Sequence, residues 1–299
     1  MAVNLGSSNI TTIKLGATDV SKIYLGSDVV FGGSAPFDSD AIAFWNANGT
    51  TGSIQQSAIN QLVLDLKGGS NSLTTNKTDL WTKIFALYPY APIDDSTATL
   101  NAYKYNLLNP LDTDAAFRML WVNAPSPTLS GVIGGSGKYG ITYFNVFNEI
   151  SVNAFTLLVG LSTENTSTQV DAGAIKTSGE FDGCQIVPYF SGLDFSFVGR
   201  LYSSTANVNR IGLQGAMHDG TNSYKIKDGN FTFSSTVSAG IAQNENILTL
   251  ARNLGATANG FSTKTQNFMV IADVLTANEV QDLNDAYVRY SANIITGGR

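Results

Sequence analysis

The chain opens with a repeat of apolar and polar positions. Val3-Asn4-Leu5-Gly6, Ile13-Lys14-Leu15-Gly16 and Ile23-Tyr24-Leu25-Gly26 follow one another at ten-residue intervals. Apolar and polar residues alternate up to a glycine that permits a turn, which predicts a short strand in each unit. Such a ribbon is too short for a core of its own, so an ordinary β-meander against the main domain and a separate module both fit. We expect residues 1–33 to form a docking or oligomerisation module whose apolar positions include Leu5, Ile13, Leu15, Ile23, Tyr24 and Leu25.

A helical period follows this repeat. Residues 31–36, Phe-Gly-Gly-Ser-Ala-Pro, have the composition of a linker to a second domain, residues 34–299. Apolar residues then recur every four positions and predict a helix that starts near Ser53 and ends at Gly68. The spacing of apolar residues between Thr78 and Pro89 predicts another helix, and residues 41–45 predict a shorter one.

Most of the remaining chain has the pattern of strands separated by turns. Strands are predicted at 102–107, 117–122, 141–144, 154–161, 185–190, 195–202, 210–217, 223–226, 231–237, 247–251 and 266–272. This spacing indicates an antiparallel β-sandwich or jelly roll. Thr276-Ala277-Asn278-Glu279 then fits a capping box, which predicts a C-terminal helix that seals an open end of the sandwich.

Composition limits the partners and the compartment. Only 13% of the residues are charged and the formal net charge is -6, which argues against a nucleic-acid partner. The longest apolar runs fall far short of the ~20 residues of a membrane span, so no membrane insertion is expected. The single cysteine, Cys184, excludes an intramolecular disulfide and is expected to be a small buried hydrophobe. No signal peptide is evident, which predicts synthesis in a cytoplasm.

Three stretches carry a resemblance to a known group of proteins. They are the N-terminal repeat, the segments Leu80–Pro89 and Lys104–Phe117, and the C-terminal motifs Ala251-Arg252-Asn253, Gly260-Phe261-Ser262 and Leu275–Val280. Together they resemble tailed-bacteriophage virion proteins, of the tail or head fibre or decoration type, that carry a concanavalin A-like lectin/glucanase domain. The resemblance implies a two-sheet jelly roll exposed on a virion.

Catalytic chemistry finds little support in the sequence. Sandwich glucanases place their carboxylates in a Glu-x-Asp-x-x-Glu pattern, and Glu180 with Asp182 lacks the second glutamate. These two acids are expected to be solvated at a strand start. His218 is the only histidine, has no nucleophile elbow to accompany it, and is expected in a solvated turn. We therefore expect no catalytic residues and predict that the chain is not an enzyme.

No cofactor is predicted, and the sequence leaves open whether the chain binds a calcium ion. Lectin-like sandwiches hold calcium with loop oxygens, for which Asp171, Asp194 and Asp219 with Asn222 are candidates without a motif to support them. Aromatic faces suit a neutral glycan, although each such tyrosine also fits a core position. The glycan-contact candidates are Tyr88, Tyr90, Tyr103, Tyr105 and Tyr139.

The resulting hypothesis is a phage structural protein located in the virion. It predicts attachment to other virion proteins through residues 1–33, a homo-oligomer with a trimer favoured, and a lectin-like domain for host cell-surface polysaccharide. A decoration protein without a ligand is the first alternative, and a polysaccharide-degrading glycosidase is the second.

Overall fold

The computed structural model describes most of the chain as two compact units, Met1–Asp38 and Ser39–Arg299. In the second unit it describes residues 39–150, 154–163, 169–176, 182–188, 193–194, 196–200, 205–206, 211–238 and 244–295. In the first unit it describes 4–5, 8–9, 13–15, 18–20, 22–25, 28–32 and 37–38. Phe31 and Gly32 of the predicted linker belong to a strand, and residues 33–36 lie outside the described part.

The described strands of the first unit form one antiparallel β-hairpin for each ten-residue repeat. β1 (Asn4–Leu5) pairs with β2 (Ser8–Asn9), β3 (Ile13–Leu15) with β4 (Thr18–Val20), and β5 (Lys22–Leu25) with β6 (Asp28–Gly32). All six apolar positions predicted for attachment therefore lie on the first strand of their hairpins. Each repeat is a hairpin instead of the single strand that the pattern predicted, and its repeated leucine pairs across a two-residue connection.

One sheet lies in the middle of the second unit, and we call it the inner sheet. Within the described residues it has eight strands, in the order β20-β19-β18-β12-β24-β10-β9, with β7 also paired to β24. The strands are β7 (Ile84–Tyr88), β9 (Ser126–Thr128), β10 (Gly131–Ile133), β12 (Thr156–Leu161), β18 (Gly212–His218), β19 (Asn222–Lys227), β20 (Asn230–Thr236) and β24 (Thr265–Ala272). All of their pairings are antiparallel.

The second sheet, called the outer sheet, packs on one face of the inner sheet. Its described strands follow the order β16-β14-β13-β21-β11-β8, and β22 joins the edge of β13 in parallel and pairs with β23. The strands are β8 (Leu120–Val122), β11 (Tyr139–Asn145), β13 (Ala172–Ile175), β14 (Asp182–Ile186), β16 (Phe197–Arg200), β21 (Asn246–Thr249), β22 (Arg252–Leu254) and β23 (Thr257–Asn259). The short pair β15 (Leu193–Asp194) and β17 (Thr205–Ala206) and the helix α3 (Val146–Glu149) complete this part.

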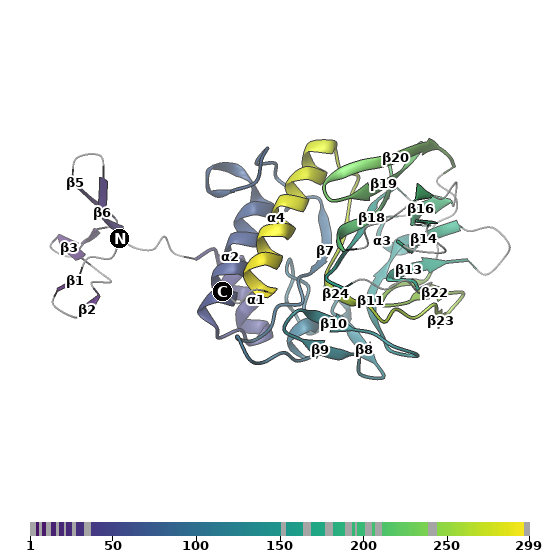
Figure 1. Cartoon of the computed structure of the whole chain (residues 1–299), viewed down its shortest axis with the longest axis horizontal. Coiled ribbons are helices and arrows are strands. Elements are labelled where there is room, and N and C mark those ends of the chain that lie inside the picture. Colours follow the sequence, from purple (N-terminus) through teal and green to yellow (C-terminus); the bar gives the residue numbers. More distant parts are fainter. Residues whose placement is uncertain are drawn as a thin grey trace. The chain divides into compact units, whose positions relative to one another are not determined.

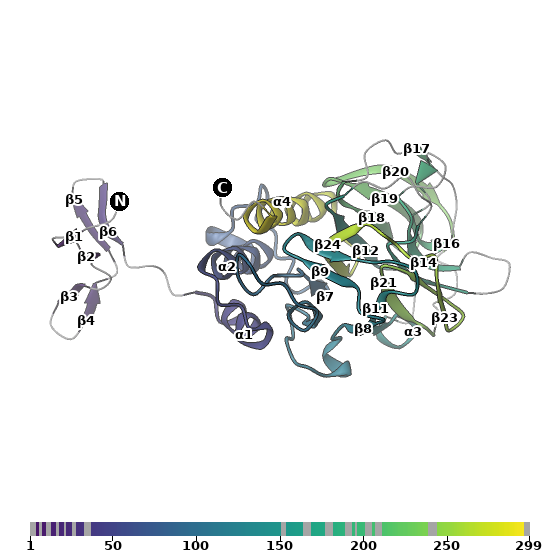
Figure 2. The same ribbon diagram turned by 60° about the horizontal axis from the view of Figure 1, so that its bottom comes forward.

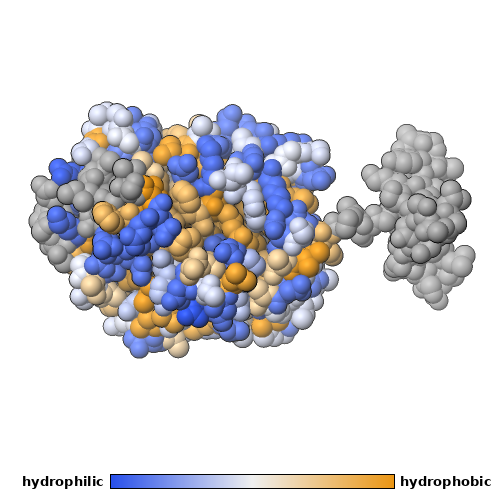
Figure 3. All heavy atoms as spheres, turned by 180° about the vertical axis from the view of Figure 1, so that it is seen from behind, coloured by the Kyte–Doolittle hydropathy of each residue, from blue (hydrophilic) through white to orange (hydrophobic). Residues whose placement is uncertain are grey.

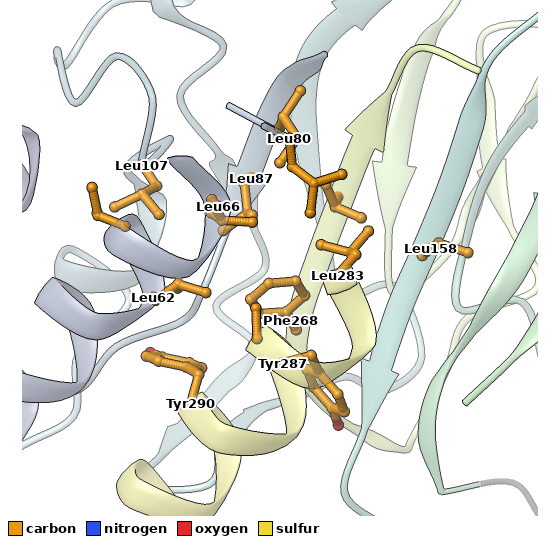
Figure 4. Packing of buried hydrophobic residues seen from close by; sticks show 14 of the residues in the cluster. Leu62, Leu66, Leu80, Leu87, Leu107, Leu158, Phe268, Leu283, Tyr287 and Tyr290 are labelled. Atoms are coloured by element: carbon orange, nitrogen blue, oxygen red, sulfur yellow. The ribbon is translucent and has the colours of Figure 1, made fainter. Parts of the chain in front are cut away.

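Helices cover the other face of the inner sheet. α1 (Ser39–Asn48), α2 (Ser53–Lys67) and α4 (Ala277–Ile295) lie together on this side, opposite the outer sheet (Figure 1; Figure 2). Phe268 of β24 contacts Tyr287 and Tyr290 of α4, with ring centroids 5.3 and 6.1 Å apart (Figure 4). The second unit thus has three layers: helices, inner sheet and outer sheet.

Alternate residues of the central strands supply two separate cores. In β12, Leu157 and Val159 face the core between the sheets, whereas Leu158 faces the helices. β24 divides in the same way, with Met269 on the first side and Phe268 on the second. The predicted fold class, an antiparallel β-sandwich with a helical lead-in and a C-terminal helix, is confirmed.

One predicted helix is a strand. Residues 84–88 form β7, which pairs with Met269–Ala272 of β24, and Leu80 to Lys83 form the turn before it. Ile84 and Leu87 face the helices while Ala86 and Tyr88 face the core between the sheets. A strand buried on both faces has no polar side, so its apolar spacing also matches a helix.

The segment before the outer sheet is also different from its prediction. Residues 102–107 were expected to form a strand, but Ala102–Lys104 is a 3-10 turn. The Asn106 side chain accepts the backbone N–H of Leu87 at 3.0 Å, and the Leu107 N–H donates to the Leu87 carbonyl at 2.8 Å. These contacts hold the segment against β7 without a continuous strand pairing.

The capping box of the C-terminal helix is confirmed. The Thr276 N–H donates to the Glu279 carboxylate at 2.7 Å, and the Glu279 N–H donates to the Thr276 hydroxyl at 3.4 Å. Lys83 also pairs with Glu279 at 2.8 Å. The helix does not seal an end of the sandwich: Val280, Leu283 and Tyr287 pack it along the face of the inner sheet, because its apolar stripe needs a broad apolar surface.

Candidate functional site

Four of the five tyrosines predicted to contact a glycan are core residues. Tyr88, Tyr90 and Tyr103 are at most 2% exposed, and Tyr105 is 9% exposed. Burial raises the pKa of the Tyr88 hydroxyl well above its ordinary value. The prediction that these four side chains contact a glycan is wrong, because packing removes both faces of each ring from solvent.

Tyr139 lies on the outer face of the outer sheet. Residues 140, 142 and 144 of β11 are buried, whereas 139, 141, 143 and 145 are partly exposed, which places the second set on the face away from the core. The Tyr139 ring contacts the ring of Phe261, with centroids 6.0 Å apart and an interplanar angle of 32°. Both residues are partly exposed. We call them the Tyr139–Phe261 ring pair.

Arg252 reaches across the same sheet. Its Nη1 donates to Oε1 of Gln185 at 2.7 Å, and its Nε donates to Oδ1 of Asn259 at 2.8 Å. β14 and β22 pair with opposite edges of β13, so the bond to Gln185 spans that strand. Gln185 lies between Cys184 and Ile186, which both face the core, and therefore lies on the outer face. We call Gln185, Arg252 and Asn259 the Arg252 cluster.

The charge of Arg252 has no carboxylate partner among the described residues. Its hydrogen-bond partners are neutral amide oxygens. Burial is the one cause that lowers the pKa of its guanidinium, and no neighbouring charge raises it. The three other arginines in the described part of the chain, Arg118, Arg200 and Arg289, each pair with an aspartate at 2.9–3.0 Å. Arg252 is thus an oriented cation without a counter-charge in the described part of the chain.

The surroundings of the Arg252 cluster follow from the strand register. One row of paired residues runs from the edge strand β8 to β16, and its members are Leu120, Ile141, Leu248, Gly173, Gln185 and Phe197. Leu120 and Ile141 reach solvent, whereas Leu248, Gln185 and Phe197 are at most 5% exposed. Asn253, the residue after Arg252, pairs with Ala174 in parallel, which places Arg252 at the edge of β13. A Cβ at Gly173 would come within 2.5 Å of the Cys184 carbonyl oxygen, so β13 and β14 approach each other closely here.

A glycine joins the cluster to the ring pair. Gly260 lies between Asn259 and Phe261 and has a φ of +68°. A Cβ there would come within 2.6 Å of the Val170 side chain, and the Gly260 carbonyl accepts the Val170 N–H at 2.7 Å. Glycine is therefore required at this close approach, which fixes Asn259 and Phe261 relative to each other.

The residues considered for calcium lie in separate places. Asp171 is fully buried and pairs with Lys264 at 2.7 Å. Asp194 contacts the backbone of a neighbouring residue, and only Asp219 and Asn222 share a turn. Within the described residues, no group of three or more His, Cys, Asp or Glu side chains could hold a metal ion.

His218 is buried in β18, so the expectation of a solvated turn is wrong. Its Nδ1 accepts the Gly220 N–H at 2.8 Å, and Nε2 lies 3.1 Å from the Val237 carbonyl oxygen. These two contacts hold the ring inside the fold. Cys184 is buried as predicted, and burial raises the pKa of its thiol to about 12.

Asp182, one of the two acids considered for glycoside hydrolysis, is not solvated as expected. Asp182 is 1% exposed and pairs with Arg200 at 2.9 Å. The desolvated carboxylate needs this partner. Glu180 lies outside the described residues.

Exposed apolar surface does not single out another site. The most exposed large apolar side chains, Leu73, Leu111, Phe147 and Val288, come from separate elements. Apolar and hydrophilic areas alternate over the face of the second unit drawn in Figure 3. A hollow of about 300 Å³ between α2 and α4 is lined by small, apolar and amide side chains without a charged group. Among the described residues, no helix has the length and apolarity to span a membrane.

Sequence reasoning missed the Arg252 cluster and Phe261 as site residues. The sequence contained a signal for part of the cluster, a hairpin with its turn at Gly255 and Ala256. Arg252 and Asn259 lie at equal distances from this turn and pair across it. That symmetry would have placed an amide opposite the arginine. The contact with Gln185 had no signal, because it depends on which strands border β13.

The sequence matches no known family model, and no relative was found among curated proteins. Three solved structures show a limited likeness. A Trypanosoma rangeli sialidase bound to 2,3-difluorosialic acid has 13% identity and a TM-score of 0.46 over 77% of this chain and 38% of that one. Domain 4 of a GH43 extracellular arabinanase from Geobacillus stearothermophilus, in complex with arabinotriose, has 16% identity and a TM-score of 0.37 over 68% and 98%. The binding domain of botulinum neurotoxin DC, in complex with rat synaptotagmin II, has 10% identity and a TM-score of 0.42 over 69% and 52%. This chain thus spans well under half of the sialidase.

These likenesses correct one prediction. The chain was predicted not to be an enzyme, but two of these three structures come from enzymes, a sialidase and an arabinanase. The exclusion is therefore withdrawn. At this level of similarity the comparison assigns no reaction to the chain.

Proposed function

We propose that the Ser39–Arg299 unit binds glycans on the outer face of its outer sheet. The observation that carries the proposal is the partly exposed Tyr139–Phe261 ring pair next to the Arg252 cluster. Aromatic rings offer an apolar face to the C–H groups of a sugar, while amide and guanidinium groups offer hydrogen bonds to its hydroxyls. Binding sites commonly combine such apolar surface with a few oriented polar groups.

The rigidity of this face supports the proposal. Asn259 and Phe261 are held by the close approach of Gly260 to Val170, and Tyr139 belongs to a paired strand. A ligand that binds groups already held in place loses less entropy on binding. Amides in fixed positions can also distinguish one arrangement of hydroxyls from another.

A glycan array probed with the full chain tests the proposal. Binding to at least one class of bacterial surface polysaccharide is expected. Tyr139→Ala and Phe261→Ala should each lower the affinity for that glycan about tenfold, in line with loss of an aromatic contact worth about 1 kcal/mol or more.

A second ring pair offers a matched control. Tyr224 and Phe231 contact each other on the inner sheet, with centroids 4.9 Å apart. Phe231→Ala removes a partly exposed ring of the same kind and should leave the affinity unchanged. Equal losses in the control and the site variants, or no binding to any glycan, would contradict the proposal.

We also propose that the chain is a component of a phage virion, attached as a trimer through residues 1–33. The resemblance of the sequence motifs supports this, and so does the repetition of one hairpin unit whose leucine pairs across a two-residue connection. Light scattering on the full chain and on residues 34–299 tests the attachment. A threefold mass for the full chain and a single mass for the shorter one are expected, and equal masses would reject the trimer.

A further inference from the structure

We infer that Arg252 recognises a carboxylate on the bound glycan, so that the site selects acidic sugars over neutral ones. The inference rests on the proposed glycan binding and names its ligand class. It starts from one contrast: the other described arginines each have an aspartate partner, and Arg252 has two amides.

The geometry leaves the guanidinium ready for a second partner. Gln185 and Asn259 use two of its five N–H groups, one on Nη1 and one on Nε. The three others, on Nη1 and Nη2, have no partner among the described residues. Because the group is planar, two anchored N–H groups fix its orientation, and parallel donors suit the two oxygens of a carboxylate.

The electrostatics favour an anion at this position. The chain has a formal net charge of -6, so an acidic ligand is repelled by the molecule as a whole and needs a local cation. Arg252 is partly removed from water, and a carboxylate brought by the ligand would supply the counter-charge that the described residues do not. Partial burial also strengthens the attraction, since the effective dielectric constant is lower than in water.

Arg252 also has a structural role, which the experiment must separate from the recognition of charge. It links β22 to β14 and β23, and its loss could loosen the sheet without any effect specific to charge. Arg252→Gln keeps a polar, hydrogen-bonding side chain and removes the charge. Arg252→Lys keeps the charge but loses the planar fork.

The test compares acidic oligosaccharides with their carboxyl-reduced counterparts. The probes are oligogalacturonates, alginate oligomers and sialyllactose, each titrated calorimetrically into the full chain next to the same glycan with its carboxylate reduced to an alcohol. At least one acidic probe should bind about tenfold or more tightly than its reduced form, and the difference should shrink as salt is raised. Arg252→Gln should abolish this difference, and Arg252→Lys should restore part of it.

Controls distinguish the possible failures. Arg118→Gln removes an arginine that already pairs with aspartates and should leave the preference intact. Equal losses for acidic and reduced probes in Arg252→Gln, with a matching fall in melting temperature, would assign Arg252 a structural role and overturn the inference. Equal binding of both probe forms to the wild type would also overturn the inference while leaving glycan binding in place.

Binding of a sulfate ester as tightly as the carboxylate would overturn the carboxylate assignment. Failure of every probe and of the whole glycan array would instead reject the proposed function.

Discussion

The two sheets of the second unit differ in what covers their faces. Every residue of β12 and β24, at the centre of the inner sheet, is buried, because helices lie on one side and the outer sheet on the other. In β11 of the outer sheet, buried and partly exposed residues alternate. The outer sheet therefore has a partly exposed face at β11 that can carry ligand chemistry, whereas every residue of its strands β13 and β14 is buried.

Sequence patterns record this difference. Phe268 to Ala272 is an unbroken apolar run, as a strand buried on both faces requires. Tyr139 to Asn145 places Gly140, Thr142 and Phe144 inward and larger or polar groups outward. The comparison predicts that equivalent substitutions will have large effects in β12 and β24 and small ones at the outward positions of β11.

The largest effect is expected where a buried ion pair joins the two sheets. Asp171 precedes β13 of the outer sheet, Lys264 precedes β24 of the inner sheet, and both are 0% exposed with 2.7 Å between the charged atoms. Lys264→Met leaves the aspartate buried without its cation. We expect a loss of about 3–5 kcal/mol in the free energy of unfolding, measured by urea denaturation.

Two further variants test whether that loss of stability comes from the unpaired buried charge. Asp171→Leu combined with Lys264→Met removes both charges and should recover much of the stability. Lys104→Met breaks a pair with Asp112, whose side chain is 47% exposed, and should cost far less because solvent screens the charges. A single Lys264→Met variant as stable as the wild type would show that this ion pair does not hold the sheets together.

A smaller effect is expected from matched truncations on the two opposite faces of the sandwich. Leu158 of β12 is 0% exposed beneath the helices, and Ile141 of β11 is partly exposed on the outer face. Leu158→Ala should cost about 2–5 kcal/mol, since it leaves a cavity. Ile141→Ala should cost about 1 kcal/mol, because water already reaches its side chain.

The same denaturation experiment measures both truncations. Similar losses for the two variants would mean that the outer face is as tightly packed as the helix-covered one. That result would also remove the basis for an open binding surface there.

Elements with a local sequence signal, such as a helix cap or a regular apolar period, were predicted correctly. The four-residue period and Gly68 fixed α2, the Thr276–Glu279 box fixed the start of α4, and most strands of the two sheets were found near their observed positions. β7 was not predicted as a strand because its apolar residues pack into both cores, so the strand lacks the alternation of apolar and polar residues. Its strand pairing with β24 involves residues about 180 positions away along the chain.

The candidate site was less predictable than the fold. Tyr139 was identified from the sequence, but Tyr88, Tyr90, Tyr103 and Tyr105 have the same chemistry and are buried. Aromatic composition does not distinguish a core ring from a ligand-binding one, since both need an apolar environment.

By itself, the sequence determined the repeat of residues 1–33, the β-rich class and the helix caps, because each depends on neighbours a few positions apart. Only the tertiary structure decided that α4 lies on a sheet face and that Arg252 crosses β13 to Gln185, 67 positions away along the chain. Such contacts depend on the order of strands that are distant in the sequence. This order also decides that the partners of Arg252 are neutral amides and not carboxylates.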